Sequence, residues 1–131
     1  MPSGIWPDFA VEDGTRWRLT LSVPTMSVSP SELANQLGST TPPVLLDVRE
    51  PEEHAFVHLP GSILIPLSEL AERADELNAM RDRSIVVYCH HGVRSAHAIG
   101  LLRTLGFTRL WNLSGGIDRY SLEVDPGLPR Y

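Results

Sequence analysis

The chain has 131 residues, of which 42% are hydrophobic and 21% charged, the proportions of one ordinary globular domain. Its net charge of -5 gives no reason to expect a nucleic-acid or membrane partner, because neither surface attracts an acidic protein over long range. No apolar run approaches the roughly 18 residues that span a bilayer, and no secretory signal is visible, so we expect a cytoplasmic protein.

The first 25 residues differ from the remainder. Trp6 and Phe9 are scattered among polar residues, and the alternation over 16–21 is typical of a short edge strand. We expect an N-terminal arm of unassigned role over residues 1–25 and a regular domain over residues 26–131. Packing of the arm on the domain, self-association through it, and disorder of its first dozen residues all remain open.

From residue 26 onward, apolar periodicity and capping signals predict alternating helices and strands. The clearest helix start is Ser29-Pro30-Ser31-Glu32, which has the layout of a capping box. Helices are predicted at about 30–37, from about 51, at 67–81, at 94–105 and after Gly115-Gly116; strands are predicted at 43–48, 62–65, 84–88 and 108–111. Strands that alternate with helices imply a parallel sheet covered on both faces.

The single cysteine, Cys89, directly follows the most apolar predicted strand. Open α/β sheets bind their ligands at the carboxyl ends of such strands. With one cysteine no internal disulfide can form, so Cys89 is buried and inert, a metal ligand, or reactive. The polar residues that follow it favour the reactive case, because a loop this polar has no reason to flank a core residue.

The segment from Cys89 to Ser95 predicts an anion-binding loop. A short loop that closes onto a helix start points several backbone N–H groups inward, and the helix dipole adds positive potential. Arg94 adds a permanent positive charge and His90 and His91 a conditional one, while Gly92 permits the tight turn. These features favour the thiolate form of the cysteine and would bind the oxyanion of a donor such as thiosulfate.

Two pairs of segments, in this order and spacing, are specific to one family. The first pair is Leu46-Asp47-Val48-Arg49-Glu50-Pro51-Glu52-Glu53-His54 and His58-Leu59-Pro60-Gly61-Ser62; the second is Cys89-x-x-Gly92-x-Arg94-Ser95 and Leu113-Ser114-Gly115-Gly116-Ile117. With these segments the chain resembles a single-domain rhodanese, a thiosulfate sulfurtransferase-like protein, over about residues 28–131.

The resemblance implies a rhodanese-like α/β fold with a central five-stranded parallel sheet and helices on both faces. It implies that Cys89 takes sulfane sulfur from a donor such as thiosulfate and passes it, through a persulfide, to an acceptor such as cyanide or a thiol. It further implies that loop residues His90, His91, Gly92, Val93, Arg94 and Ser95 bind the donor, and that no cofactor is needed. Asp47 and Arg49 would lie near the loop, where a structural ion pair is as consistent with the resemblance as a catalytic role.

Three alternatives remain. Cysteine phosphatases and arsenate reductases also use a thiolate in an anion-binding loop, but their signature has five residues between Cys and Arg, and here four separate Cys89 from Arg94. A metal site could use Cys89, His90, His91 and His97, although adjacent residues on a tight loop rarely converge on one ion, so we expect no metal. A relay module that accepts sulfur only from a protein partner also fits the sequence.

Overall fold

The computed structural model of the chain describes residues 26–131, so the predicted arm over 1–25 and its edge strand lie outside the described residues. The elements are β1 (Ser27–Val28), α1 (Pro30–Leu37), β2 (Val44–Asp47), α2 (Pro51–Phe56), β3 (Ile63–Leu64), η3 (Leu67–Glu69), α3 (Leu70–Arg73), η4 (Ala74–Met80), β4 (Ile85–Tyr88), α4 (Val93–Thr104), β5 (Leu110–Leu113) and α5 (Gly116–Glu123). The five strands form one parallel sheet in the order β1-β5-β4-β2-β3.

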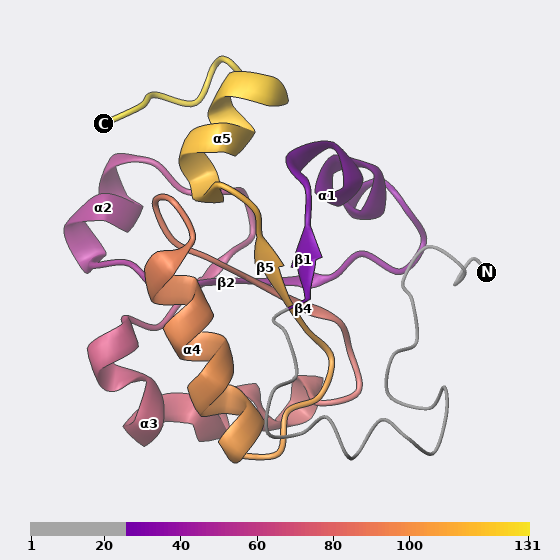
Figure 1. Cartoon of the computed structure of the whole chain (residues 1–131), viewed down its shortest axis with the longest axis vertical. Helices are drawn as coiled ribbons and strands as arrows, with labels where there is room; N and C mark the ends of the chain where they lie inside the picture. The colour runs from indigo at the N-terminus through magenta and orange to yellow at the C-terminus, as the bar shows by residue number, and fades with distance from the viewer. Residues whose placement is uncertain (1–25) are drawn as a thin grey trace.

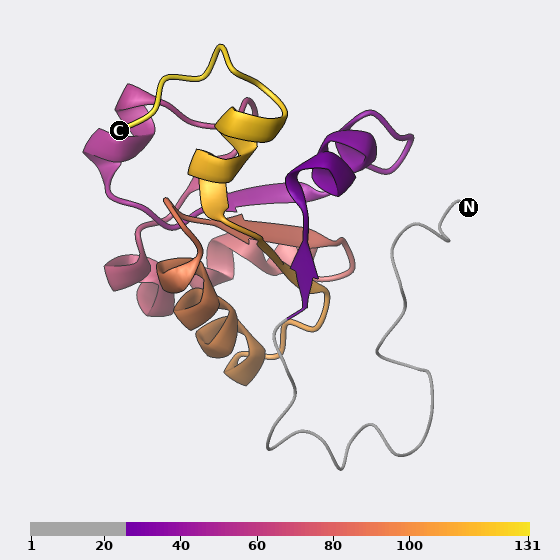
Figure 2. The same cartoon turned by 45° about the horizontal axis from the view of Figure 1, so that its top comes forward.

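Helices cover both faces of this sheet, as predicted (Figures 1 and 2). Helices α1 and α5 lie on one face, and α3 and α4 lie on the other. The central strand, β4, is hydrogen-bonded to β2 on one side and to β5 on the other. Its carboxyl end is therefore enclosed by neighbouring elements, and the residue that follows it is fixed from several directions.

The buried side chains form two hydrophobic clusters, one on each side of the sheet. Along β4, Ile85 and Val87 belong to the cluster beneath α3 and α4, and Val86 and Tyr88 belong to the cluster beneath α1 and α5. This alternation is the period of two expected of a strand buried on both faces. Cys89 continues it and joins the cluster of Ile85 and Val87.

The predicted capping box is confirmed at the start of α1. The Ser29 hydroxyl accepts a hydrogen bond from the Glu32 amide at 3.1 Å, and the Ser29 amide donates to Glu32 Oε1 at 2.8 Å. Helix α4 also ends as predicted, with Gly106 beyond it in the left-handed region at φ 95°. These ends are set by local hydrogen bonds and backbone conformations that a short stretch of sequence specifies.

Two predicted elements differ from the structure. The single helix predicted over 67–81 is divided into three consecutive elements: η3 and η4 are 3₁₀ helices, and α3 between them is an α-helix. Leu70, Ala74 and Leu77 are nevertheless buried, because their spacing specifies a buried face in either type of helix. The last strand is Leu110–Leu113 and not 108–111, since pairing with β4 begins at Leu110, opposite Ile85.

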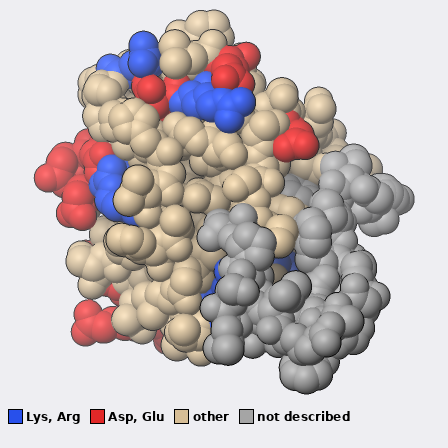
Figure 3. All heavy atoms as spheres, in the orientation of Figure 1, with Lys and Arg blue, Asp and Glu red and all other residues tan. Residues whose placement is uncertain are grey.

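None of the helices in residues 26–131 is long and apolar enough to cross a membrane. On the face shown in Figure 3, acidic and basic side chains lie close together in small groups. Several ion pairs join residues one helical turn apart, as Arg73 does with Glu69 and Arg119 with Glu123. Such exposed pairs contribute little to stability.

Candidate active site

Cys89 leaves the sheet directly after β4, and only 1% of its surface is exposed. The chain then turns through three residues into α4. Gly92 makes this turn possible, because it precedes the helix at φ 117°, a conformation that side-chain-bearing residues rarely adopt. The cysteine therefore lies at the base of a short loop that closes onto a helix N-terminus, as the sequence predicts.

Backbone N–H groups of the loop point at the cysteine sulfur. The Gly92 amide donates a hydrogen bond to Cys89 Sγ at 3.0 Å, and the Ser95 amide does so at 3.4 Å. The Ser95 hydroxyl oxygen also lies 3.4 Å from Sγ. This arrangement stabilises negative charge on sulfur, because the donors are fixed by the backbone and need no reorganisation.

The start of α5 holds the loop in this orientation. The amides of Ile117 and Asp118 donate to the carbonyl oxygens of Cys89 and His90, at 3.0 and 3.2 Å. Gly116, which comes just before these amides, has no room for a side chain: a Cβ would overlap the His90 carbonyl and lie 2.6 Å from the Cys89 carbonyl oxygen. With its carbonyls bound to α5, the loop can direct its N–H groups toward the sulfur.

Asn112, on β5, fixes the other side of the loop. Its Oδ1 accepts a hydrogen bond from the Ser95 hydroxyl at 2.6 Å, and its Nδ2 donates to the Gly92 carbonyl at 3.1 Å. One side chain thus supports both residues whose amides bind Cys89 Sγ. Strand β5 and helix α5 together determine the loop's shape.

Arg94 is held by a carboxylate. Its two terminal nitrogens donate to the two oxygens of Glu53, on α2, at 2.7 and 3.0 Å. Glu53 also accepts a hydrogen bond from the Glu50 amide at 2.9 Å and from the Tyr131 hydroxyl at 2.7 Å. Hydrogen bonds from Arg94 above all lower the pKa of Glu53 to about 2, although burial alone would raise it. Glu53 is therefore ionised throughout the physiological range.

Asp47 and Arg49 form a fully buried ion pair next to this group. Two guanidinium nitrogens of Arg49 donate to the two oxygens of Asp47, at 2.9 and 2.7 Å, and neither side chain is exposed to solvent. Arg49 also donates to the Val57 carbonyl and to the Tyr131 hydroxyl. Burial lowers the pKa of Arg49, but hydrogen bonds to Asp47 and Tyr131 outweigh it and raise the pKa overall. The pair binds the chain at Val57, just after α2. It is connected to the loop by Tyr131, whose hydroxyl binds Arg49 and whose ring stacks on His90.

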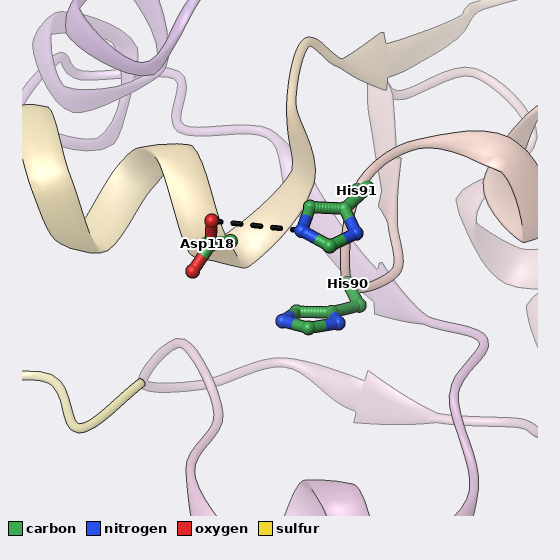
Figure 4. A group of neighbouring side chains, drawn as sticks. All are labelled: His90, His91 and Asp118. Carbon is green, nitrogen blue, oxygen red and sulfur yellow. Dashed lines mark ion pairs between the residues drawn. The ribbon is translucent and has the colours of Figure 1, made fainter. Parts of the chain in front are cut away.

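His90 and His91 are stacked on one another, with ring centroids 4.0 Å apart, and the ring of Tyr131 stacks on His90, also at 4.0 Å (Figure 4 shows the two histidines). Burial, together with the neighbouring His91, lowers the pKa of His90 and so favours its neutral form. The potential ligand atoms of His90, His91 and Asp118 lie within 4.8 Å of one another.

This group differs from a typical metal centre in two ways. The His90 and His91 rings are stacked, with 29° between their planes, so their in-plane lone pairs are poorly arranged to meet at one ion. Asp118 also accepts two hydrogen bonds from Arg130, at 2.8 and 3.2 Å. Neither Cys89 nor His97, the other ligands considered from the sequence, belongs to the group.

The profile of the Rhodanese-like domain family matches residues 29–123, which is most of the chain. The chain belongs to the rhodanese-like family. A structure of a rhodanese-related protein from Thermoplasma volcanium has 36% identity and a TM-score of 0.67, covering 76% of this chain and 93% of that one. A protein of Allochromatium vinosum named sulfurtransferase is 33% identical over 102 residues, which are 78% of this chain and 91% of that protein.

Longer proteins also contain a region similar to this rhodanese-like chain. The adenylyltransferase and sulfurtransferase uba4 of Ogataea parapolymorpha is 36% identical over 96 residues, covering 73% of the chain. The chain spans 24 to 31% of the length of this protein and of two others whose names include adenylyltransferase and sulfurtransferase. The shared region in these proteins is therefore the rhodanese-like one.

The structure brings the predicted loop together around the sulfur and adds residues for which the sequence predicted no role at the site. Gly92 and Ser95 contact Cys89 Sγ directly, whereas Arg94 pairs with Glu53. The additional residues are Glu53, Asn112, Gly116 and Tyr131. The Gly-Gly pair within a family motif was a signal for Gly116; the hydrogen bonds of the other three depend on elements far away along the chain.

Proposed function

We propose that this rhodanese-like chain is a sulfurtransferase that carries sulfane sulfur as a persulfide on Cys89. The observation that carries the proposal is the pair of backbone amides, from Gly92 and Ser95, directed at a buried cysteine sulfur. They would stabilise the thiolate before transfer and the persulfide after it. Residues 26–131 would form the domain that does this chemistry, preceded by an arm of unassigned role.

The reaction proceeds in two displacements. The Cys89 thiolate attacks the sulfane sulfur of the donor; a new S–S bond forms while the donor S–S bond breaks, and with thiosulfate the leaving group is sulfite. A nucleophile such as cyanide or a thiolate then attacks the outer sulfur of the persulfide, and the Cys89 thiolate is released. With cyanide the product is thiocyanate, and the sum of the steps consumes no other reagent.

The remaining loop residues, His90, His91, Val93 and Arg94, would line the donor's path, and the buried pair of Asp47 and Arg49 would support the loop through Tyr131. The spacing of Cys89 and Arg94, with four intervening residues, favours sulfur over phosphate as the group transferred. A phosphatase or arsenate reductase activity would need a larger loop than this one.

A second candidate, a relay that receives sulfur from a protein, is favoured by the surface around the loop. Among residues 26–131, five large hydrophobic side chains are exposed, and three of them border the site: Phe56, Val93 and Tyr131, at 56, 68 and 45%. Tyr131 packs on both His90 and Phe56. Grouped exposed apolar side chains are typical of surfaces that contact another protein. The relatives named adenylyltransferase and sulfurtransferase are consistent with such a role.

Intact-protein mass spectrometry tests the proposal. After incubation with thiosulfate, or with a cysteine desulfurase and cysteine, the wild-type chain should gain about 32 Da, the mass of one sulfur atom, and cyanide should reverse the gain. Cys89→Ser should gain nothing. A gain only with the desulfurase would favour the relay, and no gain with either donor would refute persulfide chemistry.

A further inference from the structure

Arg94 is the only arginine in the loop from Cys89 to Ser95, so it is the loop's only permanent positive charge. In the structure that charge is already paired. Glu53 binds both terminal nitrogens of the guanidinium in the two-pronged arrangement that carboxylates and anionic substrates share. Glu53 therefore occupies the two-pronged edge of the guanidinium, two of its five N–H donors, which a small oxyanion would bind in the same way.

The pairing is hard to displace, because the carboxylate is saturated. Oε1 accepts from the Glu50 amide and from Arg94, and Oε2 accepts from Arg94 and from the Tyr131 hydroxyl. A carboxylate offers about four acceptor positions, and all four are filled. The Tyr131 hydroxyl is itself fixed, since it also accepts a hydrogen bond from the buried guanidinium of Arg49 at 2.9 Å.

The other arginines that the structure places beside the loop are paired as well, Arg130 with Asp118 and Arg49 with Asp47. His90 favours its neutral form, and the Asp118 carboxylate beside His91 is paired with Arg130. The Gly92 and Ser95 amides are aimed at Cys89 Sγ, so they act on the transferred sulfur more than on the remainder of the donor. A donor with two negative charges therefore gains little electrostatic binding free energy from the side chains around this site.

We propose that Glu53 is a specificity-determining residue, which disfavours dianionic sulfur donors such as thiosulfate and leaves the site to persulfides borne by thiols. This inference rests on the proposed function and names its donor class. In the favoured step the Cys89 thiolate attacks the outer sulfur of a persulfide, R–S–SH; one S–S bond forms as the donor's breaks. The donor leaves as the thiolate R–S⁻, and the proton on the outer sulfur moves with that sulfur.

The chain offers a matched pair of variants for the test. Glu53→Gln removes the negative charge and breaks the two-pronged contact, yet glutamine is an accepted residue at this capping-box position, so α2 should remain folded. Glu52→Gln removes the same charge from the neighbouring position of α2, where the side chain is exposed and forms no ion pair within residues 26–131. Thermal melts followed by circular dichroism establish that both variants fold.

Steady-state transfer to cyanide is then measured with two donors, thiosulfate and cysteine persulfide. Glu53→Gln should lower the KM for thiosulfate roughly tenfold, the effect of removing one unit charge a few ångströms from a dianion. Its KM for cysteine persulfide, and both values for Glu52→Gln, should change less than about twofold. A third arm with a desulfurase-borne persulfide distinguishes a protein donor from a small one.

Three results would overturn the inference: an unchanged or higher thiosulfate KM in Glu53→Gln, an equal decrease for both donors, or an equal decrease in Glu52→Gln. An unchanged or higher KM in Glu53→Gln would mean that Glu53 only positions Arg94. An equal decrease in Glu52→Gln would mean that the KM depends on the net charge of α2 and not on Glu53 itself. Failure of the proposed function is distinguishable from these, because neither wild type nor any variant would then take sulfur from any donor.

Discussion

Gly116 offers a direct test of how the active loop is held. It begins α5 at φ 65°, and its Cα faces the backbone of the loop. In Gly116→Ala the new methyl group would overlap the His90 carbonyl and lie 2.6 Å from the Cys89 carbonyl oxygen. Both are backbone atoms, so no side-chain rotation can relieve the contact. We expect the loop and the start of α5 to move apart.

The cost of this substitution has two parts. A residue other than glycine in the left-handed region costs about 1–2 kcal/mol, and overpacking of a close contact costs about 1–3 kcal/mol more. The free energy of unfolding should therefore fall by about 2–5 kcal/mol, a large share of the roughly 5–15 kcal/mol of a typical domain. The loop should also lose the hydrogen bonds from the Ile117 and Asp118 amides, and alkylation of Cys89 by iodoacetamide near pH 7 should slow about tenfold.

Gly100→Ala is the matched control. Gly100 lies within α4, its φ is not positive, and an added Cβ meets open space. Alanine there should raise the free energy of unfolding by about 0.5–1 kcal/mol and leave alkylation unchanged. Urea denaturation and alkylation rates are compared for the two variants. If Gly116→Ala unfolds within about 0.5 kcal/mol of wild type and reacts at the same rate, the account of the loop is wrong.

Three further predictions concern the groups around the sulfur. Arg94→Ala leaves the Glu53 carboxylate unpaired in a partly exposed site. It should therefore raise the thiosulfate KM several-fold and lower the free energy of unfolding by about 1 kcal/mol, and an unchanged KM would contradict this. Ser95→Ala should slow alkylation of Cys89 less than about tenfold, because both backbone donors remain, while calorimetry should show about 1 kcal/mol lost with the bond to Asn112. With the pKa of Glu53 near 2, against an ordinary 4.5, its stabilising contribution is complete above about pH 4.5 and is lost as the pH falls toward 2. The free energy of unfolding, measured with urea, should therefore decrease less between about pH 6 and about pH 3 in Glu53→Gln than in wild type. An equal decrease in the two proteins would contradict the assignment.

The buried pair of Asp47 and Arg49 illustrates a role that the sequence left open. The family resemblance placed both residues near the loop, as catalytic supports or as a structural ion pair. In the structure they bind each other, the Val57 carbonyl and the Tyr131 hydroxyl, and no hydrogen bond joins either of them to Cys89. Removing one partner would leave an uncompensated buried charge, which is strongly destabilising. Loss of activity in such a variant would therefore say little about catalysis.

Much of the fold could be predicted because its signals are local. The capping box at Ser29 and Glu32, the two-sided apolar run of β4 and the glycine at position 106 each specify a conformation within a few residues. The stripe over 67–81 predicted the buried side correctly but not the type of helix, since 3₁₀ and α helices present similar faces at this spacing.

The place of the proposed chemistry could be read from the sequence alone: Cys89 stands at the end of the most apolar strand, in a loop that closes onto α4. Position along the chain suffices for that, because backbone amides and a helix start are supplied by the residues that follow directly. How strongly the positive charge of Arg94 acts on a bound donor could not be predicted without the fold, because its partner comes from another segment. Glu53 is 41 residues from Arg94, and Tyr131 is 78 residues from Glu53. The strength of a charge depends on its partner and its solvent, and both are set by which segments the fold brings together.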